Sequence, residues 1–378
     1  MRNNIFFYTL LCLFAISCRK TESSPQVMSF TPGDGGVGLV ITIKGNNFGS
    51  SASHVTIYFN TIAASPLTVT DSLITVQVPA GATSGKISVV VNGIKTESTA
   101  IFGILPGTWT KKADLPFAPG RAGGAGFAIG NKGYYIGGTN NGNYFNDVYE
   151  YDPATDQWTQ ETSCPGTHFA SPVNFVIGNK IYIGICQNEN GNSNEFWEYD
   201  PTYDAWTQMA NFPGPSRKGV LSFAIGNQGF VGSNDPNVND FWMYDQNTDI
   251  WTQKNNPPPG VNSSWPASFV IGNNAYTGAG SVNSLFWKYD PLTDTWASET
   301  DFPGNPYGLS GCSINGMGYL FGYEDDSYAF NPTSDSWSPV AFFGIRDFGV
   351  SFVIGSNAYY GTGSETEGFL NDFWEFTP

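Results

Sequence analysis

The chain has 378 residues, with 16 lysines and arginines against 32 aspartates and glutamates, a formal net charge of −16 at pH 7. So acidic a protein would repel phosphate backbones, which argues against nucleic acid as a partner. Charged residues make up 13% of the chain and aromatic residues 16%, the opposite of a disordered composition. Because 45 glycines and 24 prolines interrupt the chain more often than helices allow, we expect an all-β fold.

Residues 1–17 have the features of an export signal, with Arg2 followed by the apolar run IFFYTLLCLFAI and Ser17 before Cys18. The AISC ending resembles the lipobox of bacterial lipoproteins, which implies that Cys18 becomes the lipidated N-terminus. The alternative is an ordinary secretory signal with an incidental cysteine. Residues 18–26 are polar and are expected to form a tether to acyl chains that anchor the protein in a membrane.

Residues 27–104 alternate apolar and polar positions in short runs such as LVITIKG, SHVTIYFN and KISVVVNG, each closed by Gly or Asn. This pattern is typical of a small antiparallel sandwich. The order of its segments, SFTPGDGGVGLVITIKGNNFG and then VQVPAGATSGKISVVV, resembles the IPT/TIG family of immunoglobulin-like domains. The resemblance implies a spacer or adhesion module in a surface protein.

Residues 108–378 contain an internal repeat. Six tryptophans recur at intervals of 41 to 49 residues, and five of them follow one phrase, as in VYEYDPATDQW and FWEYDPTYDAW. A second phrase lies upstream, as in GFAIGNKGYYIGG. Repeats of this length with about four short strands each predict a β-propeller, and the residues resemble the kelch family. A last phrase, FWEFTP, ends the chain without its fourth strand, so we expect the strand around Trp109 to complete the last of six blades.

The repeated polar and aromatic residues are expected to be scaffold. The Asp-Pro-x-Thr-Asp phrase is typical of a turn, and we favour that interpretation over a calcium site at Asp152 and Asp156. Tryptophans that recur in every blade are packing positions between blades. Trp265 alone lies outside both repeated positions.

Loops of variable length, before the first strand and after the second strand of each blade, share one face of the predicted propeller. Binding specificity usually resides in such loops. The same geometry brings Cys164 near Cys186 and predicts a disulfide, with reduced thiols as the alternative and Cys312 free in its strand. No spacing of Cys and His indicates zinc.

Three of the five arginines, Arg121, Arg217 and Arg346, occupy one equivalent position at the start of the innermost strand. In one interpretation they bond neighbouring loop carbonyls. In the other, they converge on the channel mouth and bind a carboxylate or phosphate, with a Trp or Tyr stacking on a sugar ring. The other candidate ligand-binding residues near this position are Trp265, His168 and Tyr307.

The sequence contains few residues that suit a known enzyme mechanism. A copper oxidase of the galactose-oxidase type needs more histidines than His54 and His168, which lie in different domains. A nucleophilic triad lacks a base and a nucleophile motif. The chain is closer to kelch-type bacterial sialic-acid epimerases, which would imply a cofactor-free reaction using loop carboxylates. Those carboxylates are Glu189, Glu324, Asp325 and Asp326.

We therefore expect an outer-membrane lipoprotein, monomeric and without cofactor or metal, whose propeller is a non-catalytic recognition module. Its ligand would be a glycan or an anionic small molecule, with the immunoglobulin-like domain as spacer. The first alternative is an adhesion scaffold that binds a protein loop, and the second is an epimerase or mutarotase acting on an acidic sugar.

Overall fold

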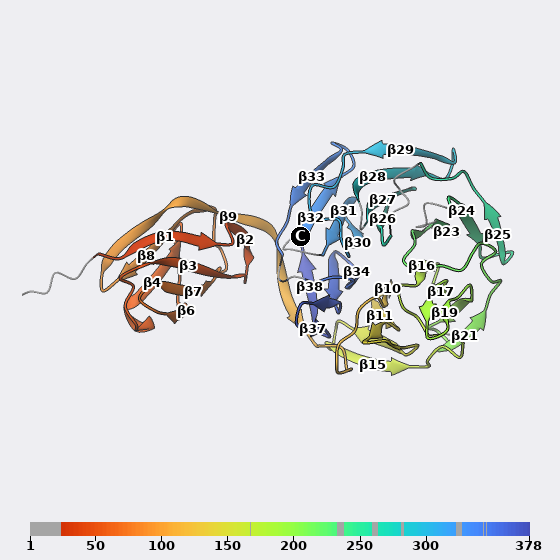
Figure 1. The fold of residues 1–378 in the computed structure, drawn as a ribbon, viewed down its shortest axis with the longest axis horizontal. Coiled ribbons are helices and arrows are strands. Elements are labelled where there is room, and N and C mark those ends of the chain that lie inside the picture. Colours follow the sequence, from red (N-terminus) through yellow and green to blue (C-terminus); the bar gives the residue numbers. More distant parts are fainter. Residues whose placement is uncertain are drawn as a thin grey trace, which may run out of the picture.

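The computed structural model describes residues 24–378, apart from residues 167, 233–237, 259–263, 281–282, 323–326, 343 and 345. The export segment, Cys18, Glu324, Asp325 and Asp326 lie outside the described residues. The described chain is all-β, with a single 3₁₀ turn, η1 (Ala52–His54). It forms a small sandwich followed by a six-bladed propeller (Figure 1). No helix in the described part is long and apolar enough to cross a membrane.

Two sheets form the sandwich. The first has the order β1-β3-β7-β6, and the second contains β8, β4 and β5 together with the long strand β9. The strands are β1 (Gln26–Thr31), β2 (Asp34–Val37), β3 (Val40–Asn46), β4 (Val55–Phe59), β5 (Ile62–Ala64), β6 (Pro66–Val69), β7 (Leu73–Gln77), β8 (Gly85–Val91) and β9 (Ile94–Lys112). Alternation along β3 buries Ile41 and Ile43 in the core between the sheets, as expected for a strand with one face in a core.

Each blade of the propeller is a four-stranded antiparallel sheet. We label the strands of a blade a to d, from the channel outward. Blade 1 has β10 (Ala125–Ile129), β11 (Lys132–Ile136), β14 (Val148–Asp152) and β15 (Gln157–Glu161); blade 2 has β16 (Val173–Ile177), β17 (Lys180–Gly184), β20 (Phe196–Asp200) and β21 (Ala205–Gln208); blade 3 has β22 (Ser222–Ile225), β23 (Gln228–Gly232), β24 (Phe241–Asp245) and β25 (Ile250–Gln253). Blade 4 has β26 (Ala267–Ile271), β27 (Asn274–Gly280), β28 (Asn283–Asp290) and β29 (Thr295–Glu299); blade 5 has β30 (Ser310–Ile314), β31 (Met317–Phe321), β32 (Ser327–Asn331) and β33 (Ser336–Pro339); blade 6 has β34 (Val350–Ile354), β35 (Asn357–Gly361), β38 (Phe373–Thr377) and β9.

The loops between strands b and c of blades 1, 2 and 6 each form a two-stranded hairpin. These hairpins are β12 (Thr139–Asn140) with β13 (Asn143–Tyr144), β18 (Gln187–Asn188) with β19 (Gly191–Asn192), and β36 (Ser364–Glu365) with β37 (Gly368–Phe369). A single β-bridge joins each hairpin to the loop that precedes strand a of its own blade, as between Ala122 and Thr139. The hairpins therefore belong to the face that carries the variable loops.

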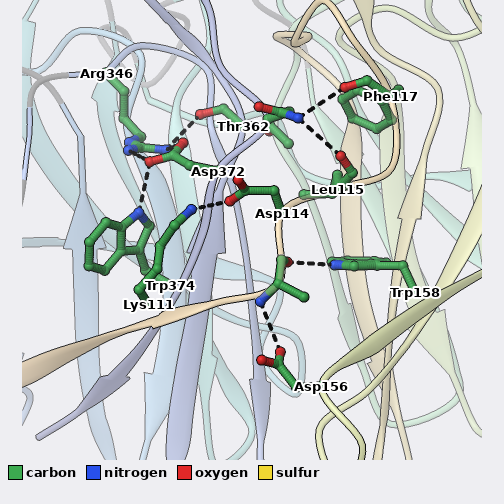
Figure 2. Close-up of polar contacts among 12 residues, drawn as sticks. Lys111, Asp114, Leu115, Phe117, Asp156, Trp158, Arg346, Thr362, Asp372 and Trp374 are labelled. Atoms are coloured by element: carbon green, nitrogen blue, oxygen red, sulfur yellow. Dashed lines mark hydrogen bonds and ion pairs between the residues drawn. The ribbon is translucent and has the colours of Figure 1, made fainter.

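The propeller closes as the sequence predicts. Strand β9 pairs with β38, so that Trp109 lies opposite Phe376 and the two ends of the domain share blade 6. Figure 2 shows the junction with blade 1, where the Asn371 side chain donates hydrogen bonds to the carbonyls of Leu115 and Phe117, each at 3.1 Å. The pairing covers the outer edge of β38, which would otherwise be an open strand edge prone to aggregation.

Repeated side chains join neighbouring blades at the outer rim. The indole Nε1 of each repeated tryptophan donates to a backbone carbonyl of the adjacent blade: Trp109 to Ala341, Trp158 to Ala113, Trp206 to Thr162, Trp251 to Ala210, Trp296 to Asn255 and Trp337 to Thr300. Asp152 accepts a hydrogen bond from Ala154 N–H in its own turn, and Asp156 accepts from Tyr151 Oη and Ala113 N–H. The described residues contain no cluster of His, Cys, Asp and Glu that could hold a metal ion. The Asp-Pro-x-Thr-Asp phrase therefore forms a turn and bonds one blade to the next.

Candidate functional site

The three equivalent arginines lie in buried ion pairs. Each guanidinium forms two parallel hydrogen bonds with one aspartate of its own blade. The Nη1–Oδ1 and Nη2–Oδ2 distances are 2.5 and 2.9 Å for Arg121 with Asp147, 2.5 and 2.9 Å for Arg217 with Asp240, and 2.7 and 2.7 Å for Arg346 with Asp372. The arginines are only 3 to 6% exposed. Paired bonds of this kind satisfy the charge of a guanidinium and fix its direction.

Backbone carbonyls and aromatic rings complete the surroundings of these arginines. Arg121 donates to Gly137 O, Arg217 to Pro215 O and Arg346 to Thr362 O. The guanidinium of Arg121 also lies between the rings of Phe117 and Phe145. The interpretation in which these arginines bond loop carbonyls therefore describes the structure. The interpretation in which they converge on the channel mouth does not, because each guanidinium is buried and bonded to an aspartate and to a backbone oxygen.

The electrostatic effect of such a pair is visible at Asp372. Burial alone would raise the pKa of this carboxyl, but the hydrogen bonds and charge of Arg346 and the indole N–H of Trp374 outweigh burial and hold the pKa below its usual value. Figure 2 shows Arg346, Asp372 and Trp374 in this arrangement. A charged aspartate is what the arginine needs for full pairing.

The aspartate partners were missed in the sequence, although a pattern marks them. The dipeptide Asn-Asp stands directly before strand c in the three blades that carry the arginine, as Asn146-Asp147, Asn239-Asp240 and Asn371-Asp372. Each asparagine donates to backbone carbonyls between one blade and the next, as Asn146 does to Cys164 O at 2.7 Å. The dipeptide thus holds the blade's own arginine and also the neighbouring loop.

A ring of six residues rims the channel on the variable-loop face, one from each blade just before strand a. All six have a left-handed backbone: Gly123, Ser171, Gly219, Trp265, Gly308 and Phe348, with φ between 49° and 65°. Five backbone hydrogen bonds run from residue to residue around the ring, namely Gly123 N to Phe348 O, Ser171 N to Gly123 O, Gly219 N to Ser171 O, Trp265 N to Gly219 O and Phe348 N to Gly308 O, at 2.8 to 3.0 Å. We call these residues the mouth ring.

Bulky side chains occupy two left-handed positions of the mouth ring. Trp265 has φ 55° and Phe348 has φ 54°, a conformation that costs a bulky residue about 1–3 kcal/mol and is concentrated at functional sites. The two rings meet edge-to-face with centroids 5.3 Å apart, and Tyr307 contacts Phe348 at 5.3 Å. The structure therefore brings two of the predicted residues, Trp265 and Tyr307, together with Phe348, which the sequence reasoning missed. We call these three residues the aromatic triad.

Behind the mouth ring, the inner strands of all six blades enclose a cavity of about 470 Å³. Its described wall contains glycine, serine, alanine, valine and phenylalanine, with Asn174, Trp265, Phe348 and Cys312, and it carries no lysine, arginine, histidine, aspartate or glutamate. Burial raises the pKa of the Cys312 thiol to about 12, so it remains neutral near pH 7. The cavity thus offers an uncharged, partly aromatic surface with hydroxyl and backbone polar groups.

The remaining predicted residues take other places. His168 Nδ1 lies 2.9 Å from Glu189 Oε2, so that it joins the loop before strand a of blade 2 to that blade's hairpin. Cys164 and Cys186 are close in one hydrophobic cluster, but both are free and buried, and the predicted disulfide is not present. The Cys186 thiol instead donates to His168 O at 3.4 Å, and burial raises the pKa of both thiols to about 12, which keeps them protonated.

Two family models match the chain. The IPT/TIG domain matches residues 25–102, and the KLHDC2/KLHL20/DRC7 kelch-repeats domain matches residues 108–280. Among solved structures, one titled "Structure of YjhT" is similar with a TM-score of 0.58 and 15% sequence identity, covering 70% of this chain and 97% of the other. At that identity the likeness shows the fold alone. The search of curated proteins finds no match.

Proposed function

Because this chain is an IPT/TIG and kelch-repeat protein, whose domains are of a recognition or protein-interaction type, we propose that its propeller recognises an uncharged carbohydrate at the channel mouth. The observation that carries the proposal is the aromatic triad, in which Trp265 and Phe348 have a strained backbone and line an uncharged cavity. Aromatic faces suit the apolar faces of sugar rings, and a few polar groups in a mostly apolar pocket fix orientation.

The charge balance favours a neutral ligand over an anionic one. The arginines that were candidates for binding an anion are paired with aspartates, and the described cavity wall has no cation. A carboxylate entering this site would lose its hydration without gaining a counter-charge, which is unfavourable. We therefore narrow the expected ligand to a neutral glycan.

Export and membrane anchoring remain part of the proposal. Lipidation at Cys18 would place the propeller at the cell envelope, on the outer membrane, with the IPT/TIG domain between anchor and binding face. Strand β9 is shared between the sandwich and blade 6. This supports a stiff spacer, because one continuous strand allows little bending between the two domains.

The test is calorimetric titration of the protein with neutral and acidic oligosaccharides, using Trp265→Gly and Phe348→Gly. Glycine is the residue at the same ring position in blades 1, 3 and 5, so both variants remove a ring without adding backbone strain. We expect each to weaken binding of a neutral glycan by about tenfold or more, since one stacking contact contributes about 0.5–1.5 kcal/mol beyond its buried area.

Tyr203→Gly is the control, because Tyr203 is 79% exposed in a turn between strands c and d, on the opposite face. Binding by the native protein that survives both ring deletions would contradict the proposal, and so would binding of acidic glycans alone. Absence of any glycan binding would shift support to a protein ligand.

One observation favours that second candidate, an interaction scaffold for another protein. Three neighbouring blades expose an apolar side chain at the junction of strands c and d, namely Tyr203, Ile250 and Leu292, at 79, 56 and 91%. Exposed apolar groups on one rim suit a protein contact. The sugar-epimerase alternative lacks a comparable observation, because the one titratable side chain in the described cavity wall is the neutral Cys312 thiol.

A further inference from the structure

The mouth ring is open at one of its six junctions. By the pattern of the other five, Gly308 N–H should donate to Trp265 O, yet among the described residues neither group has a hydrogen-bond partner. Gly308 is buried. Buried backbone N–H groups almost always find a partner, and an unpaired one calls for a specific explanation such as a bound ligand.

The opening lies beneath the aromatic triad. Gly308 stands between Trp265 and Phe348 in the ring, and the side chains of these two residues meet across it. Tyr307, the residue directly before Gly308, contacts the same Phe348 ring. The indole Nε1 of Trp265 is also buried without a partner in the described part of the chain. Unpaired polar groups and strained aromatic residues therefore coincide at the junction of blades 4 and 5.

We propose that a sugar hydroxyl closes the mouth ring at this junction, accepting a hydrogen bond from Gly308 N–H and donating one to Trp265 O. This inference rests on the proposed function and names its polar contact. A hydroxyl has one donor and two acceptor lone pairs, so a single group serves both partners. An ionised carboxylate has no donor and would face the carbonyl with like charge. The open junction therefore selects hydroxyl groups over acidic ones.

The test is hydrogen exchange of glycine amides in the full protein labelled with ¹⁵N-glycine. Gly123 and Gly219 are internal controls, because they hold the same ring position with their N–H groups bonded. In the free protein we expect Gly308 to exchange at least about tenfold faster than either control. The probes are the methyl glycosides of glucose, galactose, mannose and N-acetylglucosamine, with sialic acid as the acidic probe. A saturating glycoside should slow Gly308 exchange by about tenfold and leave the controls unchanged.

A matched pair of variants adds a second readout. In Gly219→Ala the new Cβ would lie 2.3 Å from Trp265 Nε1, whereas in Gly130→Ala, in a turn between strands a and b, it would meet nothing within 4 Å at the same φ of 58°. Both carry the same backbone strain, but only Gly219→Ala displaces the indole. We expect Gly219→Ala to weaken glycoside binding by about tenfold, and Gly130→Ala to bind within about threefold of the native protein.

The outcomes separate this inference from the proposed function. Gly308 as well protected as Gly123 in the free protein would show a closed ring and overturn the inference. The same holds if a glycoside binds through Trp265 without changing Gly308 exchange, and then the proposed function stands. If none of the glycosides binds, both are wrong. Protection of Gly308 by sialic acid alone would overturn the preference for a neutral ligand.

Discussion

At the scale of single residues, the propeller shows that a buried arginine has a structural role when its aspartate partner occurs in the same repeat. Blades 1, 3 and 6 carry both arginine and aspartate, whereas blade 4 has Leu285 at the aspartate position. Blade 2 has Glu195 there, and its carboxylate accepts from Trp197 Nε1 at 3.3 Å. Each of the three arginines thus has an aspartate in its own blade, because a guanidinium left alone in the interior is strongly destabilising.

Arg346→Met should lower the free energy of unfolding by an amount that depends on pH. In the native protein the pKa of Asp372 is lowered, so its contribution is present above the ordinary aspartate pKa of about 3.9 and is lost as pH falls through the lowered value. Without Arg346, burial dominates and the carboxylate is unfavourable at neutral pH. We expect a loss of about 2–4 kcal/mol at pH 7, which shrinks as the pH falls toward 3 because the carboxyl becomes protonated.

Urea unfolding followed by tryptophan fluorescence at several pH values measures this dependence. Lys95→Met is the control, since Lys95 pairs with Glu97 on the sandwich surface with both side chains about half exposed, and such pairs contribute under about 1 kcal/mol. A difference between Arg346→Met and the native protein that stays constant from pH 7 to 3 would contradict the account of this pair.

At the scale of elements, the turn between strands c and d joins each blade to its neighbour. Asp204 has φ 47° and accepts from Tyr199 Oη at 2.7 Å within its blade, and from Thr162 N and Oγ1 of the previous blade at 2.9 and 2.7 Å. Equivalent aspartates recur in blades 1, 3 and 4 with a tyrosine. In blade 5, Phe330 replaces the tyrosine, while Asp335 keeps its bond to Thr300 N.

Because the side chains of Asp204 and Asp335 accept different numbers of hydrogen bonds, their alanine variants can be compared to test how far these bonds stabilise the protein. Asp204→Ala loses three hydrogen bonds and places alanine at a positive φ, and we expect the free energy of unfolding to fall by about 2–3 kcal/mol. Asp335→Ala loses only the bond from Thr300 N, because Thr300 Oγ1 donates to the Asp335 backbone oxygen, and it should cost about 1 kcal/mol less. Asp204→Asn keeps an acceptor and tolerates the left-handed backbone, so it should cost under about 1 kcal/mol. Equal losses for the two alanine variants, measured by chemical unfolding, would be evidence against a contribution from the tyrosine and threonine hydroxyl bonds of Asp204.

The turn between strands c and d also shows how much of the fold could be predicted from the sequence. The phrase that recurs before each tryptophan predicts the blades, the turn between strands c and d and the closing strand, because residues that repeat along the chain take the same structural position in every blade. The mouth ring has no such pattern, since its residues are Gly, Ser, Gly, Trp, Gly and Phe. What they share is a backbone angle. The sequence likewise placed the arginines at one position but could not give the direction of their guanidiniums, which depends on aspartates about 25 residues away along the chain.

At the scale of the whole molecule, one strand couples the two domains. Strand β9 pairs with β8 in the sandwich, with β2 between the domains and with β38 in blade 6. The junction is close-packed: Ala341 N donates to Pro106 O at 2.7 Å, and Gly36 faces Ala341. Figure 1 shows the sandwich beside the rim of the propeller, with β9 running from one to the other. A binding face on such a body would be held at a fixed orientation to its anchor.

Gly36→Leu tests whether close packing at the junction sets the orientation of the sandwich relative to the propeller. A Cβ at Gly36 would lie 2.3 Å from the Ala341 Cβ, whereas a Cβ at Gly33 meets nothing within 4 Å, and neither glycine has a positive φ. Close-packed interiors do not absorb such an overlap without movement. We therefore expect Gly36→Leu to shift the sandwich against the propeller and to lower stability by about 1–3 kcal/mol, while Gly33→Leu leaves both unchanged. Small-angle X-ray scattering measures the distance distribution between the two domains. Scattering curves that coincide for the two variants would mean that the junction is compliant and that β9 alone does not set the orientation.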